Sequence, residues 1–405
     1  MNILSRLSGL YSRLDRKKLW ILWTANLLWI VLLFSYLCCI DSKAAGWEEN
    51  IPDLSSLDCT SAVLMEASTG RVLYEQNADE AFPPASVTKV MTLLLTMEAI
   101  EKGNITLDQM LTASAHAASM GGTQVFLEVG EQMSVEDLLK SVIIASANDA
   151  AVVLAEAIAG SEESFVSMMN SRAAELGMKN THFENTNGLD DTAINHVTSA
   201  RDIAIMSREL IAHEKILQYS GIWMDTVRNG EFGLTNTNRL VRFYSGATGL
   251  KTGSTSKAKF CISATAKRDG MHLIAVIMGA PTRDIRNAEA AKWLDWGFAN
   301  YSLYTYPPCD QGTIKLLGAN ADSLTCRTDG ISILVPKGAA SKVTVETEIP
   351  ESVSAPVTEG DVVGKLTFKL DGGQVGEAKI ISSSSANRIT FAELLFILIQ
   401  RFILW

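Results

Sequence analysis

Pro84-Ala85-Ser86-Val87-Thr88-Lys89-Val90-Met91-Thr92 is the stretch around which the rest of the chain is organised. Pro83 and Pro84 are tolerated only before or in the first turn of a helix, so a helix is predicted to begin here and to run inward. Residues three apart on a helix share a face, and the Lys89 ammonium is therefore expected to reach the Ser86 hydroxyl. Burial would lower the pKa of Lys89, and a neutral lysine can take the proton of a serine nucleophile. The stretch predicts a nucleophile beside its base.

The Ser-x-x-Lys spacing alone is weak evidence. It recurs as Ser254 with Lys257 and as Ser256 with Lys259. An isolated pair of this kind is in most proteins an N-cap serine followed by an exposed lysine. Only the context of Ser86 separates it from the other two pairs.

Two further motifs supply that context. Ser146-Ala147-Asn148 follows a predicted apolar helix, and Lys251-Thr252-Gly253 lies on a predicted strand. Ser-Ala-Asn also occurs at residues 385–387 in a polar linker, where it is predicted to be structural. A strand bearing Lys251 and Thr252 offers a cation and a hydroxyl to a carboxylate, while Gly253 would let the backbone approach a bound acyl chain closely. The three motifs in this order are far more specific than any one of them.

Composition and charge limit the class of protein. The chain has 405 residues, 47% of them hydrophobic, and a net charge of -10, which argues against a nucleic-acid partner. A basic start is followed by an apolar run, Leu19 to Ile40, and by the small residues of Ser42-Lys43-Ala44-Ala45. This pattern predicts an export signal, with an uncleaved membrane anchor as the alternative. The body of the protein is expected outside the cytoplasm in either case.

The remaining cysteines and the histidines predict no metal site and no other cofactor. Outside the cell Cys309 and Cys326 are close enough in sequence to pair, and two more cysteines are expected to be buried free thiols. His196 is predicted to be structural. The two expected free thiols are Cys59 and Cys261, while Cys38 and Cys39 fall inside the export signal. The other histidines, which are scattered without ligand spacing, are His116, His182, His213 and His272.

The order of predicted elements indicates an α/β (α+β) fold in which helices flank one sheet. Two short strands form a hairpin, several helices follow, and strands return near Lys251, so the order differs from an alternating βαβ pattern. Beyond Pro308 the alternating runs predict a small all-β domain. The predicted elements are strands Ser61 to Glu66, Arg71 to Glu75, Leu250 to Thr255, Phe260 to Ala266 and His272 to Met278, and helices Leu138 to Ile144, Ala150 to Ala159, Ser161 to Leu176, Ser199 to Ile211 and Asn287 to Phe298.

At these motifs the sequence resembles the penicillin-binding, low-molecular-mass serine D-alanyl-D-alanine carboxypeptidases, most closely their exported, sporulation-associated members. The likeness covers about residues 62–301 and, more loosely, the β domain. Thr186 departs from it, standing where the family usually has proline, and so does Ser254, where histidine is common. Further matching stretches are Thr69-Gly70-Arg71-Val72-Leu73-Tyr74, Asn187-Gly188-Leu189, His196 with Ser199-Ala200-Arg201-Asp202, and Arg286 with Glu289 and Ala290.

The resemblance implies a penicillin-binding fold, in which helices flank a sheet. It also implies an enzyme that cleaves the terminal D-Ala from peptidoglycan stem peptides. It further implies inhibition by β-lactams. Ser86 would attack with Lys89 as base, and the backbone N–H groups of Ser86 and Ser254 would form the oxyanion hole. Ser146 would relay the proton to the leaving D-Ala, and Asn148 would bind the substrate backbone. The terminal carboxylate would be held by Lys251, Thr252 and Arg286, although helix capping or a salt bridge is the alternative for Arg286.

Two other functions stay open at this point. A β-lactamase needs a second base for deacylation, and the stretch after Ser161 offers Glu162 and Glu163 but no Glu-x-x-Leu-Asn pattern. A silent scaffold on the cell wall would have no need to keep all three motifs. The predicted organisation is a signal peptide or anchor over 1–45, a serine carboxypeptidase domain over 55–302, a small β domain over 303–381, and a linker with an anchoring helix over 382–405.

The last residues, Thr390 to Trp405, predict an amphipathic helix. Glu393, Gln400 and Arg401 share one face, and nearly all other side chains are apolar. The segment is too short to span a bilayer comfortably, and the serine run Ser382 to Ser385 before it is predicted to be a flexible linker. An in-plane anchor on the outer face of the bacterial cytoplasmic membrane is therefore expected, as the resemblance also implies.

Overall fold

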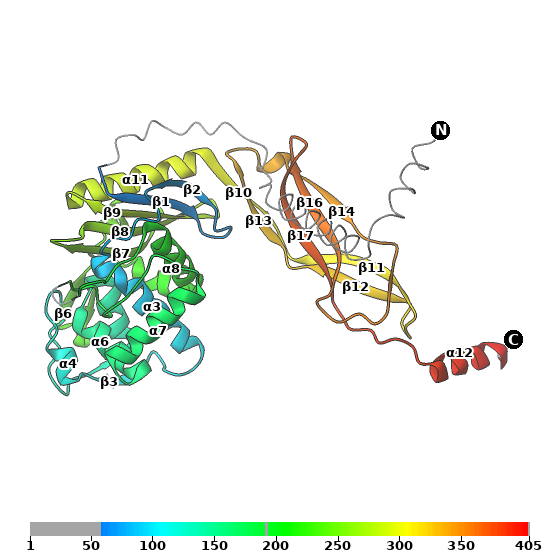
Figure 1. The fold of residues 1–405 in the computed structure, drawn as a ribbon, viewed down its shortest axis with the longest axis horizontal. Helices are drawn as coiled ribbons and strands as arrows, with labels where there is room; N and C mark the ends of the chain where they lie inside the picture. Colours follow the sequence, from blue (N-terminus) through cyan, green and yellow to red (C-terminus); the bar gives the residue numbers. More distant parts are fainter. Residues whose placement is uncertain (1–57, 191–192, 404–405) are drawn as a thin grey trace, which may run out of the picture.

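The structure is a computed structural model that describes residues 58–190 and 193–403 (Figure 1). A domain with a five-stranded sheet, two small two-stranded sheets and several helices leads into a smaller β domain, and a short helix follows at the C-terminal end (Figure 1). The mixed fold and the C-terminal β domain agree with the predicted class. The predicted export signal, 1–45, lies outside the described residues.

The first domain is built on a five-stranded sheet in which neighbouring strands run antiparallel. The hairpin predicted at its edge is present, and the Glu66 carboxylate closes its turn by accepting the backbone N–H groups of Ser68 and Thr69. The strands, in spatial order, are β2 (Val72–Gln76), β1 (Ser61–Glu66), β9 (Met271–Ala280), β8 (Lys259–Arg268) and β7 (Ala247–Thr255).

Alternate side chains of the sheet enter two different cores, as the period of a strand requires. In β9 one set packs toward the helical body of the domain and the other toward α11 (Arg283–Asn300), which covers the opposite face of the sheet (Figure 1). The first set is Ile274, Val276 and Met278, and the second is Leu273, Ala275 and Ile277. Both faces are buried, which is why β8 and β9 are apolar throughout their centres.

Capping residues set the ends of the predicted helices. The side chains of Ser134, Ser161 and Ser199 each accept a backbone N–H of the first turn that follows. Gly160 ends one helix in the left-handed region, at φ 83°. The helices are α3 (Lys89–Glu101), α5 (Val135–Lys140), which continues as a π-turn η2 (Ser141–Ala145), α6 (Asn148–Ala159), α7 (Glu162–Glu175) and α8 (Ala200–Ala212).

Short elements complete this domain and surround its motifs. They are the 3₁₀ turn η1 (Ala85–Thr88), β3 (Met110–Thr112), α4 (Ala115–Ala118), β4 (Gln132–Ser134), α9 (Glu214–Ser220), β5 (Met224–Val227), the turn η3 (Arg228–Gly230), β6 (Phe232–Thr235) and α10 (Leu240–Phe243).

The β domain has its own core, centred on Leu366 and Phe368. A two-stranded ribbon of β10 and β13 follows α11, and a six-stranded sheet has the order β14-β16-β17-β12-β11-β15. The strands are β10 (Tyr301–Tyr306), β11 (Cys309–Leu317), β12 (Ser323–Thr328), β13 (Ile331–Pro336), β14 (Thr344–Glu348), β15 (Ser352–Ser354), β16 (Val362–Leu370) and β17 (Gly373–Ser382), with a turn η4 (Ala340–Lys342).

Pairing of Cys309 with Cys326 is wrong, because both thiols are free. The register of β11 and β12 places Cys326 opposite Gly312 and Cys309 opposite Thr328. Cys326 points into the core of the β domain, while Cys309 is half-buried. The two cysteines are close in sequence, but the strand register does not place them opposite each other.

The serine run before the last helix is not a free linker. The Ser382 N–H donates to the carbonyl of Asp361, and the Ser383 N–H donates to that of Thr325. Ala386 then pairs with Val357 in an antiparallel bridge. Serine composition alone predicted flexibility, but the backbone groups of this segment continue the hydrogen bonding of the β domain.

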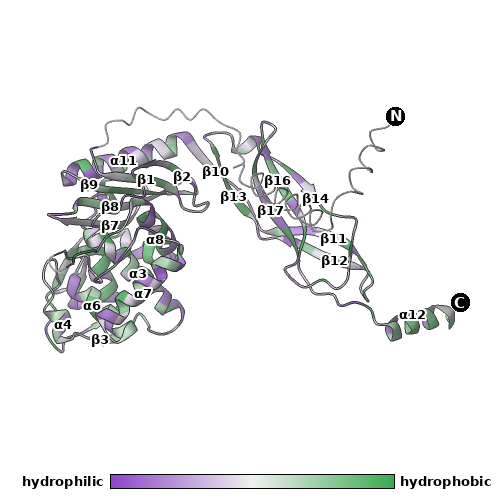
Figure 2. Cartoon of the chain, in the orientation of Figure 1, coloured by the Kyte–Doolittle hydropathy of each residue, from purple (hydrophilic) through white to green (hydrophobic). Residues whose placement is uncertain are grey.

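The last helix, α12 (Phe391–Ile403), consists mostly of hydrophobic residues (Figure 2), and many of their side chains are exposed. Thr390 and Glu393 cap its start reciprocally, the carboxylate accepting the Thr390 N–H and the Thr390 hydroxyl accepting the Glu393 N–H. Over 58–190 and 193–403, no helix has both the length and the apolar character needed to cross a bilayer. The exposed apolar residues include Phe391, Leu394, Leu395, Phe396, Leu398, Ile399 and Ile403.

Candidate active site

Ser86 lies in the 3₁₀ turn η1, directly before α3. Ala85 precedes it with a positive φ of 49°, which costs energy for a residue with a side chain and is common at functional sites. The Lys89 Nζ lies 3.0 Å from the Ser86 Oγ, as the helical spacing predicts. The turn thus brings a hydroxyl and an amine together at the start of a buried helix.

Lys89 is completely buried and has three polar neighbours. Besides Ser86, its Nζ donates to Asn148 Oδ1 at 2.6 Å and to the Asn187 carbonyl at 2.7 Å. Burial, and secondly the charge of Lys251, hold the pKa of Lys89 well below the usual 10.5. A neutral amine has two N–H groups and one lone pair. In the neutral form the two amide oxygens would accept both N–H groups, which would leave the lone pair for the serine hydroxyl.

Ser146 and Asn148 enter the site from the junction of η2 and α6. Ser146 adopts the left-handed conformation, at φ 69°, and so ends one helix and allows the next to begin. The Asn148 amide is held at both ends, because its Nδ2 donates to the Gly121 carbonyl at 2.7 Å while its oxygen faces Lys89. In this structure its contacts are therefore with the protein itself.

The third motif lies on the edge strand β7. Lys251 is buried, its Nζ donates to the Thr252 carbonyl at 2.9 Å, and burial followed by the charge of Arg286 lowers its pKa to about 7. A Cβ on Gly253 would lie 2.9 Å from the Ser86 nitrogen. Gly253 therefore lets β7 pack directly on the turn of the nucleophile. The close approach of its backbone to a bound acyl chain stays a prediction.

An open pocket of about 620 Å³ joins these elements. Six of the residues predicted for the site line it, namely Ser86, Ser146, Thr252, Gly253, Ser254 and Arg286. The Arg286 side chain is buried, and its Nη1 donates to the Cys261 carbonyl at 3.4 Å. The other lining residues are Thr123, Trp223, Thr235, Asn236, Thr237, Arg239, Phe243 and Arg283.

Comparison with known proteins agrees with this geometry. A model of the D-alanyl-D-alanine carboxypeptidase family matches residues 48–282, and the C-terminal domain of penicillin-binding protein 5 matches residues 312–388. The chain belongs to the D-alanyl-D-alanine carboxypeptidase family. It is a peptidase of that family, as the three motifs predict.

Relatives of the carboxypeptidase align with most of its length. It is 43% identical over 341 residues to D-alanyl-D-alanine carboxypeptidase DacF of Bacillus subtilis, covering 82% of this chain and 87% of the relative. It is 34% identical over 344 residues to DacC of Escherichia coli, covering 82% and 85%. Penicillin-binding protein 5 from Haemophilus influenzae, a solved structure, superposes with a TM-score of 0.73 at 32% identity, covering 82% of this chain and 98% of that one.

Sequence reasoning missed two polar groups of the carboxypeptidase site. Asn187 was noted only as part of a matching stretch, yet its carbonyl contacts the amine of Lys89. Thr237 was not singled out, although it lines the pocket and accepts a hydrogen bond of 2.7 Å from the Thr252 hydroxyl. A backbone carbonyl leaves no signal in residue type. The alternation of Thr and Asn over 235–238 was the only hint of Thr237.

His196 has a structural position, as predicted. It is buried, and its Nδ1 accepts the backbone N–H of Glu184 at 3.0 Å. Its Nε2 must then carry the hydrogen, and it lies 2.7 Å from the Thr88 hydroxyl. His196 thus supports the turn of the nucleophile from behind, and burial lowers its pKa to about 4.

Proposed function

We propose that the protein removes the terminal D-Ala from peptidoglycan stem peptides through an acyl-enzyme on Ser86. The observation that carries this proposal is the setting of Lys89, whose two N–H groups are engaged by amide oxygens while its nitrogen faces Ser86 Oγ at 3.0 Å. Lys89 takes the serine proton as Oγ bonds to the penultimate D-Ala carbonyl carbon. The developing oxyanion is stabilised by the backbone N–H groups of Ser86 and Ser254.

The leaving group requires a proton and the substrate requires an anchor. Ser146, which lines the same pocket as Ser86, passes a proton to the amine of D-Ala as the peptide C–N bond breaks. Lys251, Thr252 and Arg286 hold the terminal carboxylate, and Asn148 holds the substrate backbone. Water then hydrolyses the ester on Ser86, which frees the shortened peptide.

The same nucleophile would be acylated by β-lactams. A relative from Listeria monocytogenes, penicillin-binding protein D2, was solved in an ampicillin-bound form and superposes with a TM-score of 0.56 at 32% identity, over 61% of this chain and 100% of that one. Fast hydrolysis of the penicilloyl ester is not expected here. Of the two acids after Ser161, Glu162 is bound to Thr186 and His116, and Glu163 is exposed.

The direct test is intact-mass measurement with penicillin, together with release of D-Ala from a stem peptide. Penicillin is expected to add once, at Ser86, and the adduct is expected to persist. Rapid turnover of penicillin would favour a β-lactamase. Failure of both acylation and D-Ala release in a folded protein would favour a silent scaffold.

We further propose that the exported enzyme works at the outer face of the cytoplasmic membrane and is held there by α12. The exposed apolar side chains of this helix support in-plane binding, in which the helix lies along the interface. Deletion of the residues after Ser385, from protein whose N-terminal signal has been cleaved, should release active enzyme into the soluble fraction. Retention of that truncated protein on the membrane would place the anchor elsewhere. A role in sporulation, which the resemblance implies, remains a prediction.

A further inference from the structure

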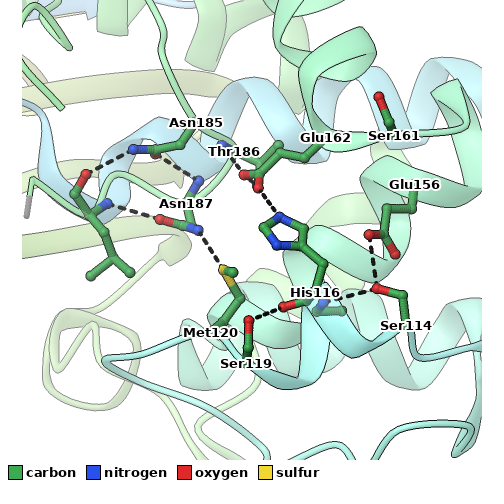
Figure 3. A network of polar contacts seen from close by, with 12 residues as sticks. Ser114, His116, Ser119, Met120, Glu156, Ser161, Glu162, Asn185, Thr186 and Asn187 are labelled. Carbon is green, nitrogen blue, oxygen red and sulfur yellow. Dashed lines mark hydrogen bonds and ion pairs between the residues drawn. The ribbon is translucent and has the colours of Figure 1, made fainter. Parts of the chain in front are cut away.

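A carboxylate outside the pocket, that of Glu162, connects α4 with the loop of residues 185–189 (Figure 3). Glu162, in the first turn of α7, accepts the backbone N–H of Thr186 at 3.0 Å and the Thr186 hydroxyl at 2.7 Å, both on Oε1. Its other oxygen lies 2.7 Å from His116 Nε2. One side chain therefore ties α4 to the loop of residues 185–189.

The loop side of this arrangement ends at Lys89. Thr186 is buried, its N–H and hydroxyl are held by Glu162, and its carbonyl accepts the Thr92 hydroxyl at 2.6 Å. Both peptide groups of Thr186 are thus fixed. The next carbonyl along the chain, that of Asn187, is the one that accepts from Lys89 Nζ.

The segment that follows α4 also contacts Lys89 indirectly, through Asn148. His116 lies in α4, and the segment that follows it supplies the Gly121 carbonyl, which holds the Asn148 amide. The Asn187 side chain bridges the two sides, because its Nδ2 donates to Met120 Sδ at 3.7 Å (Figure 3). One acceptor of the amine, the Asn187 carbonyl, thus lies in the loop that Glu162 holds. The other acceptor, Asn148 Oδ1, belongs to α6, and its amide is held by the segment that follows α4.

We propose that Glu162 is a positioning residue for the base of the reaction, acting through Thr186. By fixing the Asn187 carbonyl against Lys89, it keeps one N–H of the neutral amine engaged and the lone pair directed at Ser86. His116 holds the second oxygen of Glu162 and is half-exposed, so its contribution is the smaller one. The proposal rests on Ser86 and Lys89 acting as nucleophile and base.

The geometry separates the hydrogen bonds of Glu162 from its charge. Glu162→Gln keeps an oxygen that can accept both bonds from Thr186, whereas Glu162→Ala removes the acceptor. Glu163→Ala is the matched control, because Glu163 is the next residue in the same helical turn and is exposed. Thr186→Val removes the hydroxyl donor and keeps the backbone N–H.

The experiment measures single-turnover acylation of the full chain by penicillin, resolving the limiting rate from the half-saturating concentration, with the melting temperature of each variant. Glu162→Ala is expected to lower the limiting rate roughly ten- to hundredfold, because a small misplacement of a reacting group has effects of this size. The half-saturating concentration should not change. Glu162→Gln should stay within about threefold of wild type, and Glu163→Ala should equal wild type.

Thr186→Val should slow acylation about threefold, and adding it to Glu162→Ala should cause no further loss, because the two residues share one contact. A wild-type limiting rate in folded Glu162→Ala overturns the proposal, and so does an equal loss in Glu163→Ala or in Glu162→Gln. If Glu162→Ala does not fold, a wild-type rate in Thr186→Val overturns it. Failure of the wild type to be acylated at Ser86 would instead contradict the proposed function.

Discussion

Residues 86–89 and residues 254–259 carry the same Ser-x-x-Lys spacing in different structures. In the first segment the spacing falls at the start of α3, where Lys89 is fully buried and contacts the Ser86 hydroxyl. In the second it falls at the end of β7 and in the turn to β8, where Lys257 and Lys259 are exposed. Lys257 donates to the Asp190 carbonyl at 3.1 Å.

The difference shows what turns a spacing into chemistry. Residues three apart meet on a helix. The other two pairs include residues of the turn between β7 and β8, where no helix brings serine and lysine to one face. Burial also lowers the pKa of Lys89 well below its usual value. A buried amine with a lowered pKa is suited to accept a serine proton, and of the two segments only the first contains a buried lysine.

The two Ser-Ala-Asn motifs differ in the same way. Ser146 takes a left-handed conformation beside the pocket, and Asn148 is buried against Lys89. At Ser385 the hydroxyl accepts the Glu359 N–H at 2.9 Å, and the following residue pairs with Val357 in the β domain. Both copies form hydrogen bonds, but it is Ser146 of the first copy that lines the pocket of Ser86.

Ser86→Ala gives the largest expected effect and could break the comparison outright. It should abolish both penicillin labelling and D-Ala release, because the Ser86 hydroxyl lies 3.0 Å from the buried amine of Lys89 at a helix start. Peptide mapping after labelling is the measurement. Residual label on Ser254 or Ser256 would show that the second segment is reactive after all.

Lys89→Ala should slow acylation by roughly 10²–10⁴-fold, the usual contribution of a general base. The single-turnover rate with penicillin measures this, and circular dichroism checks that the fold persists. Lys257→Ala and Lys259→Ala are the controls from the second segment, and both should react at the wild-type rate. A comparable loss in either control would contradict the distinction drawn from burial.

Acid should lower the free energy of unfolding through the first segment, because the buried His196 contacts Thr88 in the nucleophile turn. Its pKa is about 4 in the folded protein and near 6.5 when unfolded, so the unfolded chain binds the proton first as pH falls. Stability is therefore lost between pH 6.5 and 4, by up to about 3 kcal/mol. Denaturant unfolding at both pH values measures the loss.

The His196→Asn variant is the control for this acid effect, since asparagine gains no charge. The variant should lose less stability than the wild type over the same pH range. Part of the wild-type loss should remain in it, because burial also lowers the pKa of His272 to about 4. An identical pH dependence in variant and wild type would contradict the role given to His196.

Lys251→Ala should have the smallest of these effects and sharpens the contrast between buried and exposed lysines. Loss of a charged hydrogen bond costs about 1.5–3 kcal/mol, so kcat/KM on free-acid peptides should fall roughly ten- to hundredfold. Peptides amidated at the C-terminus should be poor substrates of the wild type, and Lys257→Ala should match the wild type on both. Equal cleavage of amide and free acid by the wild type would refute the carboxylate role.

The wild-type pH profile gives an independent check on Lys251. Its pKa lies at about 7 in the free protein, so the ammonium is present below that pH and is lost as pH rises through it. KM for free-acid peptides should therefore rise above pH 7. The rise should be absent in Lys251→Ala.

Local signals in the sequence determined most of the fold. Serine caps, Gly160 and the apolar periodicity located α5, α6, α7 and α8 within a few residues, because helix ends depend on neighbouring residues. In the region predicted to be all-β, the alternating run Val362 to Leu370 forms the strand β16. The nucleophile turn was predictable for the same reason, since Ser86 and Lys89 are one helical turn apart.

Tertiary structure alone decided which distant groups meet. Asn148 and Asn187 hold Lys89 although neither is near it in sequence, and the contact of Asn187 uses a backbone carbonyl that every residue type possesses. The register of β11 and β12 separated Cys309 from Cys326, because one strand position changes the face to which a side chain points. Motifs predict the reacting groups, but the packing of the segments around them decides which polar groups contact the Lys89 amine.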